Sequence, residues 1–210
     1  MKKKILLTGA SGFSGKSLYK YLIKKNFSLT TFSFKKKLNK NSKNIDLSKK
    51  IRINSNFDWI IHTAAYHKIK DFNHNPKLKA KKNILMVENL IDFSKKNKIH
   101  NIIFFSTIDL NYFPYPKKKK IYIKSKAFCE KLLYTAFHKK ILKKIVILRL
   151  PAIIGEGCNE NFVKDTIQKL KKNMPVDIWN KDKKYNNIIH IKDLNKLIFK
   201  LITEKKYKQK

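Results

Sequence analysis

The sequence predicts an α/β fold in which a doubly wound parallel sheet carries helices on both faces. Short apolar runs alternate with longer stretches whose apolar residues recur at helical spacing, and this alternation is typical of a parallel sheet with covering helices. A second observation is local, because the first apolar run, 4–8, ends directly before Gly9, Gly12 and Gly15. Glycines between a strand and a helix are typical of the first unit of such a fold.

Each expected element follows from one of these patterns. Apolar runs predict strands at 4–8, 28–34, 44–47, 59–63, 101–106 and 144–150, and a last strand at 187–191. Amphipathic stretches predict helices at 12–25, 76–98, 122–139, 161–172 and 192–203. In the first helix Leu18, Tyr21 and Leu22 recur at helical spacing and so share one face.

The glycine turn predicts a Rossmann-like dinucleotide site. The chain there must turn tightly, approach a pyrophosphate and start a helix that lies close to the strand, and each demand favours glycine. The N–H groups at the helix start then hold the phosphates. The alternative is a strand-to-helix turn that merely favours glycine. The strand and helix visible on either side of the turn favour dinucleotide binding.

The formal charge of +36 does not by itself predict a nucleic-acid-binding protein. Of the 50 basic residues only Arg52 and Arg149 are arginines, and the lysines are scattered over nearly every expected helix and loop. Proteins that read base sequence favour arginine for its paired hydrogen bonds. We therefore expect no specific nucleic acid partner, only weak adhesion to RNA or anionic surfaces that salt reduces.

Cysteine spacing and hydropathy indicate the cellular compartment of the protein and whether it binds metal or enters a membrane. Cys129 and Cys158 lie far apart, and no pair of His or Cys residues has metal-ligand spacing. We expect two reduced packing residues, no metal and a cytoplasmic location. No apolar segment approaches the roughly twenty residues of a membrane span, so we expect no membrane insertion.

A second constellation predicts proton chemistry. Ser106 and Thr107 end an expected strand, and Tyr122 and Lys126 follow one helical turn apart on an expected helix. A nearby ammonium lowers the pKa of a tyrosine, so that the phenol exchanges a proton with a substrate hydroxyl near neutral pH. The Thr107 hydroxyl is expected to bind the same substrate oxygen.

The spacing of this tyrosine and lysine is not specific by itself. The pairs 21/25, 66/70 and 115/119 also place a tyrosine four residues before a lysine. Tyr122 differs from them because it follows the strand that ends in Ser106 and Thr107 and begins a helix that continues through Ser125, Lys126 and Glu130. The alternative is a surface tyrosine beside one of many lysines, and it is the preferred interpretation of the other three.

These motifs together resemble the extended short-chain dehydrogenases, also called the NAD-dependent epimerase and dehydratase family, whose members mostly act on nucleotide-linked sugars. The resemblance runs through 8–15, 45–47, 60–65, Asn83, the Thr107, Tyr122 and Lys126 set, 148–151 and 189–194. It implies Thr107, Tyr122 and Lys126 as catalytic residues. It implies cofactor contacts at Gly9, Ser11, Gly12, Phe13, Gly15, Ser33, Lys35, Asp46, Leu47, Ala64, Ala65, Tyr122, Lys126 and Pro151.

Structural roles compete with several of these assignments. Asp46 is also a residue that caps the turn after a strand, and Ala64 and Ala65 also suit a position where a helix lies close. Asn83 is expected to be a buried hydrogen-bonding residue, His62 and His190 packed histidines, and Arg149 either structural or facing a phosphate. Ser33 stands where NAD-using members carry an acidic residue. With Lys35 nearby, an uncharged Ser33 leans the prediction toward NADP over NAD.

The chain is short for this family. We expect residues 1–150 to form the dinucleotide-binding core and 151–210 a short substrate-side region packed on the same domain, so the substrate lobe is reduced. The resemblance implies an NAD(P)-dependent enzyme acting on a nucleotide-linked sugar, and a homodimer through the helices at 76–98 and 122–139. The alternative is a catalytically silent NAD(P)-binding scaffold or sensor, which the short lobe supports.

Overall fold

The computed structural model describes residues 2–34, 41–66, 75–176 and 187–204. The chain divides into two compact units, Met1–Arg149 and Leu150–Lys210. The first unit holds the sheet and the core, and the second holds a small pair of strands and two helices. None of the described helices combines the length and the apolar character that crossing a bilayer requires.

The first unit is built on a six-stranded sheet in the order β3-β2-β1-β4-β5-β6. Its strands are β1 (Lys4–Thr8), β2 (Ser28–Ser33), β3 (Ser42–Asn44), β4 (Trp59–His62), β5 (Asn101–Thr107) and β6 (Lys144–Leu150). The ladders β1/β2, β1/β4, β2/β3 and β4/β5 are parallel. This order reverses direction at β1, as in a doubly wound Rossmann-like sheet, and the predicted fold class is confirmed.

Register places the ends of the central strands side by side. Thr8 pairs with His62, and His62 pairs with Phe104. The loops that follow β1, β4 and β5 therefore leave the sheet at one edge, where parallel sheets of this kind bind their ligands. Every residue of β4 is buried, because helices cover both faces of the sheet.

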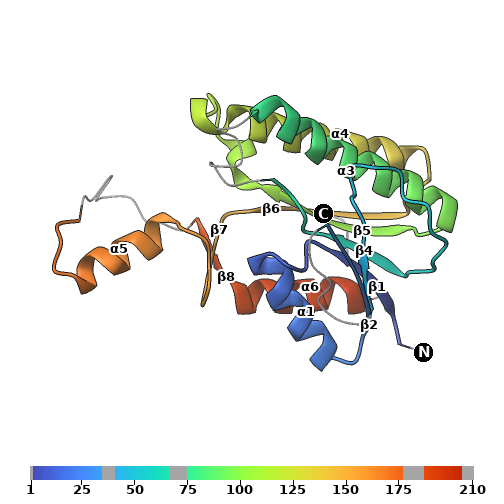
Figure 1. The fold of residues 1–210 in the computed structure, drawn as a ribbon, viewed down its shortest axis with the longest axis horizontal. Helices are drawn as coiled ribbons and strands as arrows, with labels where there is room; N and C mark the ends of the chain where they lie inside the picture. Colours follow the sequence, from blue (N-terminus) through green and yellow to red (C-terminus); the bar gives the residue numbers. More distant parts are fainter. Residues whose placement is uncertain (1, 35–40, 67–74, 177–186, 205–210) are drawn as a thin grey trace. The chain divides into compact units, whose positions relative to one another are not determined.

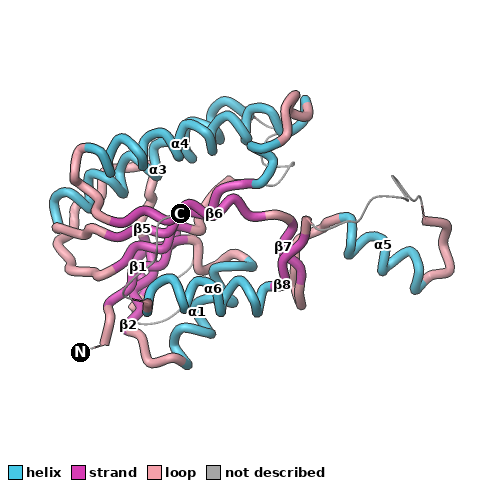
Figure 2. Tube along the Cα trace, turned by 180° about the vertical axis from the view of Figure 1, so that it is seen from behind, coloured by secondary structure: helices cyan, strands magenta, loops and turns pink. Residues whose placement is uncertain are grey.

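Within the described part of the first unit, helices lie on both faces of this sheet (Figure 1). Helices α3 (Pro76–Asn97) and α4 (Lys120–His138) lie side by side on one face, and α1 (Phe13–Lys24) lies on the other. Figure 2 shows the same layers from behind. The main core fills the space under α3 and α4, where the rings of Phe32 and Phe93 meet edge to face with centroids 5.9 Å apart.

Local chemistry explains where α3 begins and ends. The Asn75 side chain caps its N-terminus by accepting from the Leu78 N–H, and Pro76 occupies the first turn, where its missing N–H costs nothing. Lys95 and Lys96 lie in the last turn, beside the negative end of the helix dipole. Lys98 then ends the helix in the left-handed conformation.

The second unit contains β7 (Ala152–Ile154) and β8 (Ile188–His190), which form a two-stranded parallel sheet, and the helices α5 (Phe162–Lys171) and α6 (Ile191–Thr203). The sequence predicts β8 and both helices to within two residues but does not predict β7. Three apolar residues directly after Pro151 carry too little pattern to be separated from a loop.

Two further differences concern the edge strand and the site helix. The strand expected at 44–47 lies at Ser42–Asn44, because Asp46 makes a turn by accepting from the Ser48 N–H and hydroxyl. Helix α4 begins at Lys120, two residues before its expected start, directly after a short 3-10 helix at Lys117–Lys119. A second 3-10 helix, at Ile108–Asn111, follows β5 and is also absent from the sequence prediction.

Candidate functional site

A cavity of about 290 Å³ opens beyond the carboxyl ends of β1, β2 and β4. Eight predicted cofactor residues line it, namely Gly9, Ser11, Gly12, Ser33, Asp46, Leu47, Ala64 and Ala65. Seven further lining residues were not predicted as cofactor contacts, namely Phe32, Phe34, Ile45, Ser48, Thr63, Tyr66 and Met86. Most of these seven adjoin a predicted residue along the chain, so position next to the motif is the signal that was available.

The glycines of the first turn are needed for different reasons. Gly9 has φ +73°, and a Cβ there would lie 2.6 Å from the Ala64 nitrogen, so packing inside the protein requires glycine. A Cβ on Gly12 would meet only the Gly9 carbonyl oxygen, at the ordinary contact distance of 3.4 Å. Gly12 also has a φ of −79°, which any residue adopts. The missing side chain at Gly12 therefore leaves cavity space open instead of avoiding a protein clash.

The start of α1 can hold an anion. Gly12 is its N-cap and supplies no side-chain cap, and the first turn carries no acidic residue. The first N–H groups of a helix have no partners within the helix, and the dipole there favours negative charge. A pyrophosphate fits this cradle, because the space before Gly12 is open and the N–H groups are uncapped.

The opposite wall of the cavity follows β2 and β3. Asp46 Oδ1 accepts from the Ser48 N–H at 3.0 Å and from the Ser48 hydroxyl at 2.7 Å, so one carboxylate oxygen holds its own turn. The Leu47 carbonyl accepts from Asn89 of α3. Asp46 therefore has the turn-capping role. It also lines the cavity, so its contact with a cofactor stays a prediction.

The third wall follows β4. Thr63 donates its hydroxyl to the Thr8 carbonyl at 2.7 Å, which holds this segment against the glycine turn. Asn83 of α3 is buried, accepts from the Tyr66 N–H and donates to the Tyr66 carbonyl, at 2.9 and 3.0 Å. This is the structural role expected of Asn83. Lys79 Nζ lies 4.4 Å from the centre of the Tyr66 ring, a cation–π contact at the rim of the cavity.

The predicted catalytic residues gather on β5 and α4. Thr107 is the last residue of β5, and its hydroxyl accepts from the Asp109 N–H at 3.3 Å. Lys126 is buried, donates to the Phe105 carbonyl at 2.7 Å and lies 6.0 Å from the centre of the Tyr122 ring. Burial lowers the pKa of Lys126 to about 8. Thr107, Tyr122 and Lys126 are not among the residues that line the cavity.

The expected direction of the Tyr122 pKa is wrong for this structure. Burial raises the pKa of Tyr122 above its ordinary value, and the Asp109 carboxylate raises it further. The Lys126 ammonium donates to a backbone carbonyl and stands over the Phe104 ring, so the expected stabilisation of the phenolate does not prevail. Near pH 7 Tyr122 is a neutral phenol that holds its proton.

A row of side chains joins the glycine turn to Lys126. Thr8, directly before Gly9, places its hydroxyl 2.7 Å from His62 Nδ1, and the His62 ring stacks on Phe104. Lys126 Nζ lies 4.5 Å from the centre of the Phe104 ring. Burial, with a smaller contribution from Lys126, lowers the pKa of His62 to about 3, so His62 is the neutral packed histidine that was expected. The two groups of site residues therefore occupy neighbouring strands of one sheet edge.

Other assignments fall outside this picture. Phe13 and Gly15 lie in α1 beside the turn and do not line the cavity. Pro151 belongs to the second unit, and Lys35 lies outside the described residues, so both stay predictions. His190 caps α6 by accepting from the Lys192 N–H. Within the described part of the chain, no three His, Cys, Asp or Glu side chains gather as metal ligands do.

Comparison with known proteins gives a consistent result. The sequence matches the model of the NAD dependent epimerase/dehydratase family over residues 5–210. A search of curated sequences finds no significant match. Among solved structures, the chain resembles the UDP-glucose 4-epimerase of Thermus thermophilus in complex with NAD, with TM-score 0.73, 18% identity, 96% of this chain and 75% of that chain.

Two further solved structures give similar values. WbmF of Bordetella bronchiseptica, in complex with NAD+, has TM-score 0.75 and 16% identity over 96% of this chain and 70% of that chain. The UDP-N-acetylglucosamine 4-epimerase of Methanobrevibacter ruminantium, in complex with UDP-N-acetylmuramic acid, has TM-score 0.72 and 20% identity over 93% of this chain and 72% of that chain. At these identities the likeness shows a shared fold.

Proposed function

This chain belongs to the NAD-dependent epimerase/dehydratase family, and on that premise we propose that it is an NAD(P)-dependent enzyme acting on a nucleotide-linked sugar. The observation that carries the proposal is the single sheet edge that holds both groups of residues. The glycine turn and its cavity follow β1, β2 and β4. Thr107 ends β5, the strand next to β4, and Tyr122 and Lys126 lie on α4, which follows β5 in the chain. Solved relatives of this fold bind NAD and nucleotide-linked sugars.

The first unit has the features that a dinucleotide needs. The uncapped start of α1 and the open space at Gly12 suit the pyrophosphate, and the turn at Asp46 and Leu47 closes the far end of the cavity. A nicotinamide cofactor supplies hydride transfer when bound. We favour NADP over NAD because Ser33, at the end of β2, is uncharged and adds no repulsion toward a 2′-phosphate.

Proton transfer falls to the residues of β5 and α4. A neutral Tyr122 phenol donates a hydrogen bond to a substrate oxygen and gives up its proton as negative charge develops there. Burial lowers the pKa of Lys126 to about 8. The Lys126 ammonium then stabilises the Tyr122 phenolate, and the Thr107 hydroxyl binds the same substrate oxygen. This assignment makes the resting protein ready to reduce or rearrange a keto sugar.

The test is incubation with each cofactor and a panel of nucleotide-linked sugars that includes keto intermediates. Products are identified by chromatography and mass spectrometry, because an epimerase regenerates its cofactor and leaves no net absorbance change. Conversion that requires the Tyr122 hydroxyl supports the proposal. Tight cofactor binding with no conversion of any sugar indicates the scaffold or sensor alternative.

The setting and assembly of the protein are also proposed. Free Cys129 and Cys158 suit a reducing compartment such as the cytoplasm. We propose a homodimer through α3 and α4, since Leu78, Phe128 and Tyr134 are large, exposed side chains on these helices. Sedimentation of the wild type against a Phe128→Glu variant tests this, with a smaller particle expected for the variant.

A further inference from the structure

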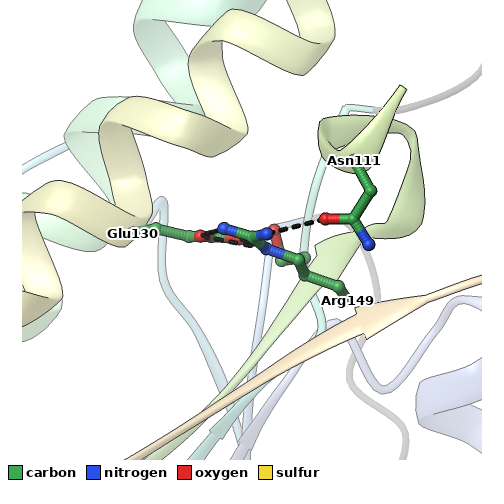
Figure 3. A network of polar contacts seen from close by, with 4 residues as sticks. Asn111, Glu130 and Arg149 are labelled. Carbon is green, nitrogen blue, oxygen red and sulfur yellow. Dashed lines mark hydrogen bonds and ion pairs between the residues drawn. The ribbon is translucent and has the colours of Figure 1, made fainter. Parts of the chain in front are cut away.

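A buried carboxylate lies next to the proposed catalytic residues and has so far been given no role. Glu130 of α4 accepts from the Ser106 hydroxyl at 2.5 Å. It also accepts from Nε and Nη2 on one edge of the Arg149 guanidinium, and the shortest of these contacts, from Nη2, is 2.8 Å. Arg149 in turn donates from Nη1 to the Asn111 side-chain oxygen at 2.7 Å (Figure 3).

The cost of this arrangement argues for a specific use. The side chain of Glu130 is only 6% exposed, while that of Arg149 is 45% exposed. A carboxylate taken out of water is stabilised only when its geometry is good and its lone pairs are satisfied. The paired hydrogen bonds from Arg149 Nε and Nη2, together with the one from the Ser106 hydroxyl, meet that condition. A buried ion pair is weak evidence of net stabilisation, and the use that fits Glu130 is to fix one arrangement of the groups it joins.

The groups that Glu130 joins are those of the proposed active site. Glu130 lies one turn after Lys126 on the same face of α4. Lys126 donates to the Phe105 carbonyl, and Glu130 accepts from the next residue, Ser106. Helix α4 is therefore fastened to β5 at two successive residues, directly before Thr107.

Arg149 extends the same contact to the segment behind Thr107. Its Asn111 partner ends the 3-10 helix Ile108–Asn111, and that helix begins at the Thr107 cap. Asp109 of this helix acts on the Tyr122 pKa, so its position affects the phenol. The side-chain network thus holds three pieces together, namely the end of β5, the 3-10 helix and α4.

We propose that Glu130, held by Arg149 and Ser106, is a positioning residue that sets Lys126 and Tyr122 of α4 against Thr107 at the end of β5. The expected changes in kcat and in the pH profile rest on the proposed function. The structural part of the inference is independent of that function, because the contacts and their effect on backbone motion exist without any substrate.

The charge of Glu130 adds a second, measurable effect. The groups that act on Lys126 are Cys129 and Glu130 of its own helix, which raise its pKa, while neutral His62 of β4, neutral Tyr122 and the Phe104 ring lie nearby. Removing the Glu130 charge lowers the Lys126 pKa further. Activity is expected to decline at high pH as Lys126 loses its proton, and in the Glu130 variant this decline begins at a lower pH.

The experiment compares Glu130→Gln and Ser106→Ala with Lys131→Gln, a matched control on the next, exposed residue of α4. Glu130→Gln is expected to lower kcat about 10- to 100-fold with KM within about threefold, as for other groups that orient reacting residues. Ser106→Ala removes one hydroxyl and is expected to lower kcat about threefold to tenfold. Cofactor affinity is expected to change by less than about threefold in all three variants, because most of the predicted cofactor contacts line the cavity beyond β1, β2 and β4.

Hydrogen exchange gives the readout that needs no substrate. In Glu130→Gln the amides of 105–112 and 120–130 are expected to exchange at least about tenfold faster than in Lys131→Gln. Ser106→Ala is expected to speed exchange of the same amides by a smaller factor, and it provides the test if Glu130→Gln fails to fold. Retained kcat and an unchanged pH profile in Glu130→Gln, in an active enzyme, overturn the inference and leave the proposed function intact. If the wild type converts no sugar, the proposed function fails, and equal exchange in variant and control then overturns the inference as well.

Discussion

The proposed cofactor cavity and the proposed proton-transfer site occupy one sheet edge but are built by different means. The cavity depends on backbone: a glycine turn, an uncapped helix start and small residues after β4. The proton-transfer site depends on long polar side chains that are buried, Lys126 and Glu130. We call the cavity the backbone site and the group around Lys126 and Glu130 the side-chain site. We expect the backbone site to tolerate substitution of neighbouring residues as long as the glycine turn is kept, whereas the side-chain site depends on partners from several elements.

The largest expected effect is chemical and concerns the side-chain site. Tyr122→Phe removes the proton donor and keeps the ring, so activity is expected to fall about 100- to 10,000-fold. Tyr21→Phe is the matched control, because Lys25 Nζ lies 6.0 Å from the Tyr21 ring centre, as Lys126 Nζ does from the Tyr122 ring centre. The control is expected to keep activity within about twofold. Equal losses in the two variants would contradict the assignment of Tyr122.

The next effect separates two glycines of the backbone site. Gly9→Ala forces a Cβ against the Ala64 nitrogen at a positive φ and is expected to cost about 3 kcal/mol of unfolding free energy. Gly12→Ala meets no such clash and is expected to change stability by less than about 1 kcal/mol, while weakening cofactor binding at least about tenfold. Urea unfolding and cofactor titration measure the two quantities. Normal cofactor affinity in Gly12→Ala would show that the open space is not used.

A third effect concerns the row of side chains that joins the two sites. Burial holds the pKa of His62 at about 3 in the folded chain, against an ordinary value of 6.5. Between these values the unfolded chain binds a proton that the folded chain does not, so stability is complete above about pH 6.5 and declines as the pH falls. The loss of unfolding free energy that His62 causes is expected to be on the order of 4 kcal/mol by pH 3.

The measurement is urea unfolding at several pH values. His62→Asn keeps a polar group near the Thr8 hydroxyl, since the bond is made through Nδ1, and removes the titration. The stability of this variant is expected to fall less steeply with acid than that of the wild type. A matched control, His138→Asn at an exposed residue, is expected to keep the wild-type slope. If the unfolding free energy falls equally steeply with acid in all three proteins, His62 is not the cause of the acid destabilisation.

The smallest effect concerns cofactor choice. Ser33→Asp places a carboxylate at the end of β2, where it repels a 2′-phosphate and accepts from a ribose 2′-hydroxyl. The ratio of NADP to NAD affinity is expected to fall about tenfold, or about 1.4 kcal/mol. Titration of both cofactors against wild type and variant measures it. A wild type that clearly prefers NAD refutes the preference for NADP before the variant is made.

Much of the cavity lining could be predicted from sequence. Gly9, Gly12, Asp46, Ala64 and Ala65 all line one cavity, because each is fixed by a turn that directly follows a strand. Local patterns also predict the strands and α-helices, apart from the short β7, the shift of β3 toward Ser42 and the two-residue earlier start of α4, while the two 3-10 helices are not predicted. The side-chain site was predicted only as a set of residues. The direction of the Tyr122 pKa was wrong, because spacing along a helix does not reveal what else the Lys126 ammonium binds.

By itself the sequence determined the order of strands and helices, the glycine turn and the family, because each is written in short, contiguous patterns. Only the tertiary structure decided which partners the buried charges have. Lys126 reaches the Phe105 carbonyl 21 residues away, and Glu130 reaches Arg149 19 residues away. Whether a buried charge holds, loses or shares its proton depends on such distant neighbours and on exclusion of water, and neither is encoded in local spacing.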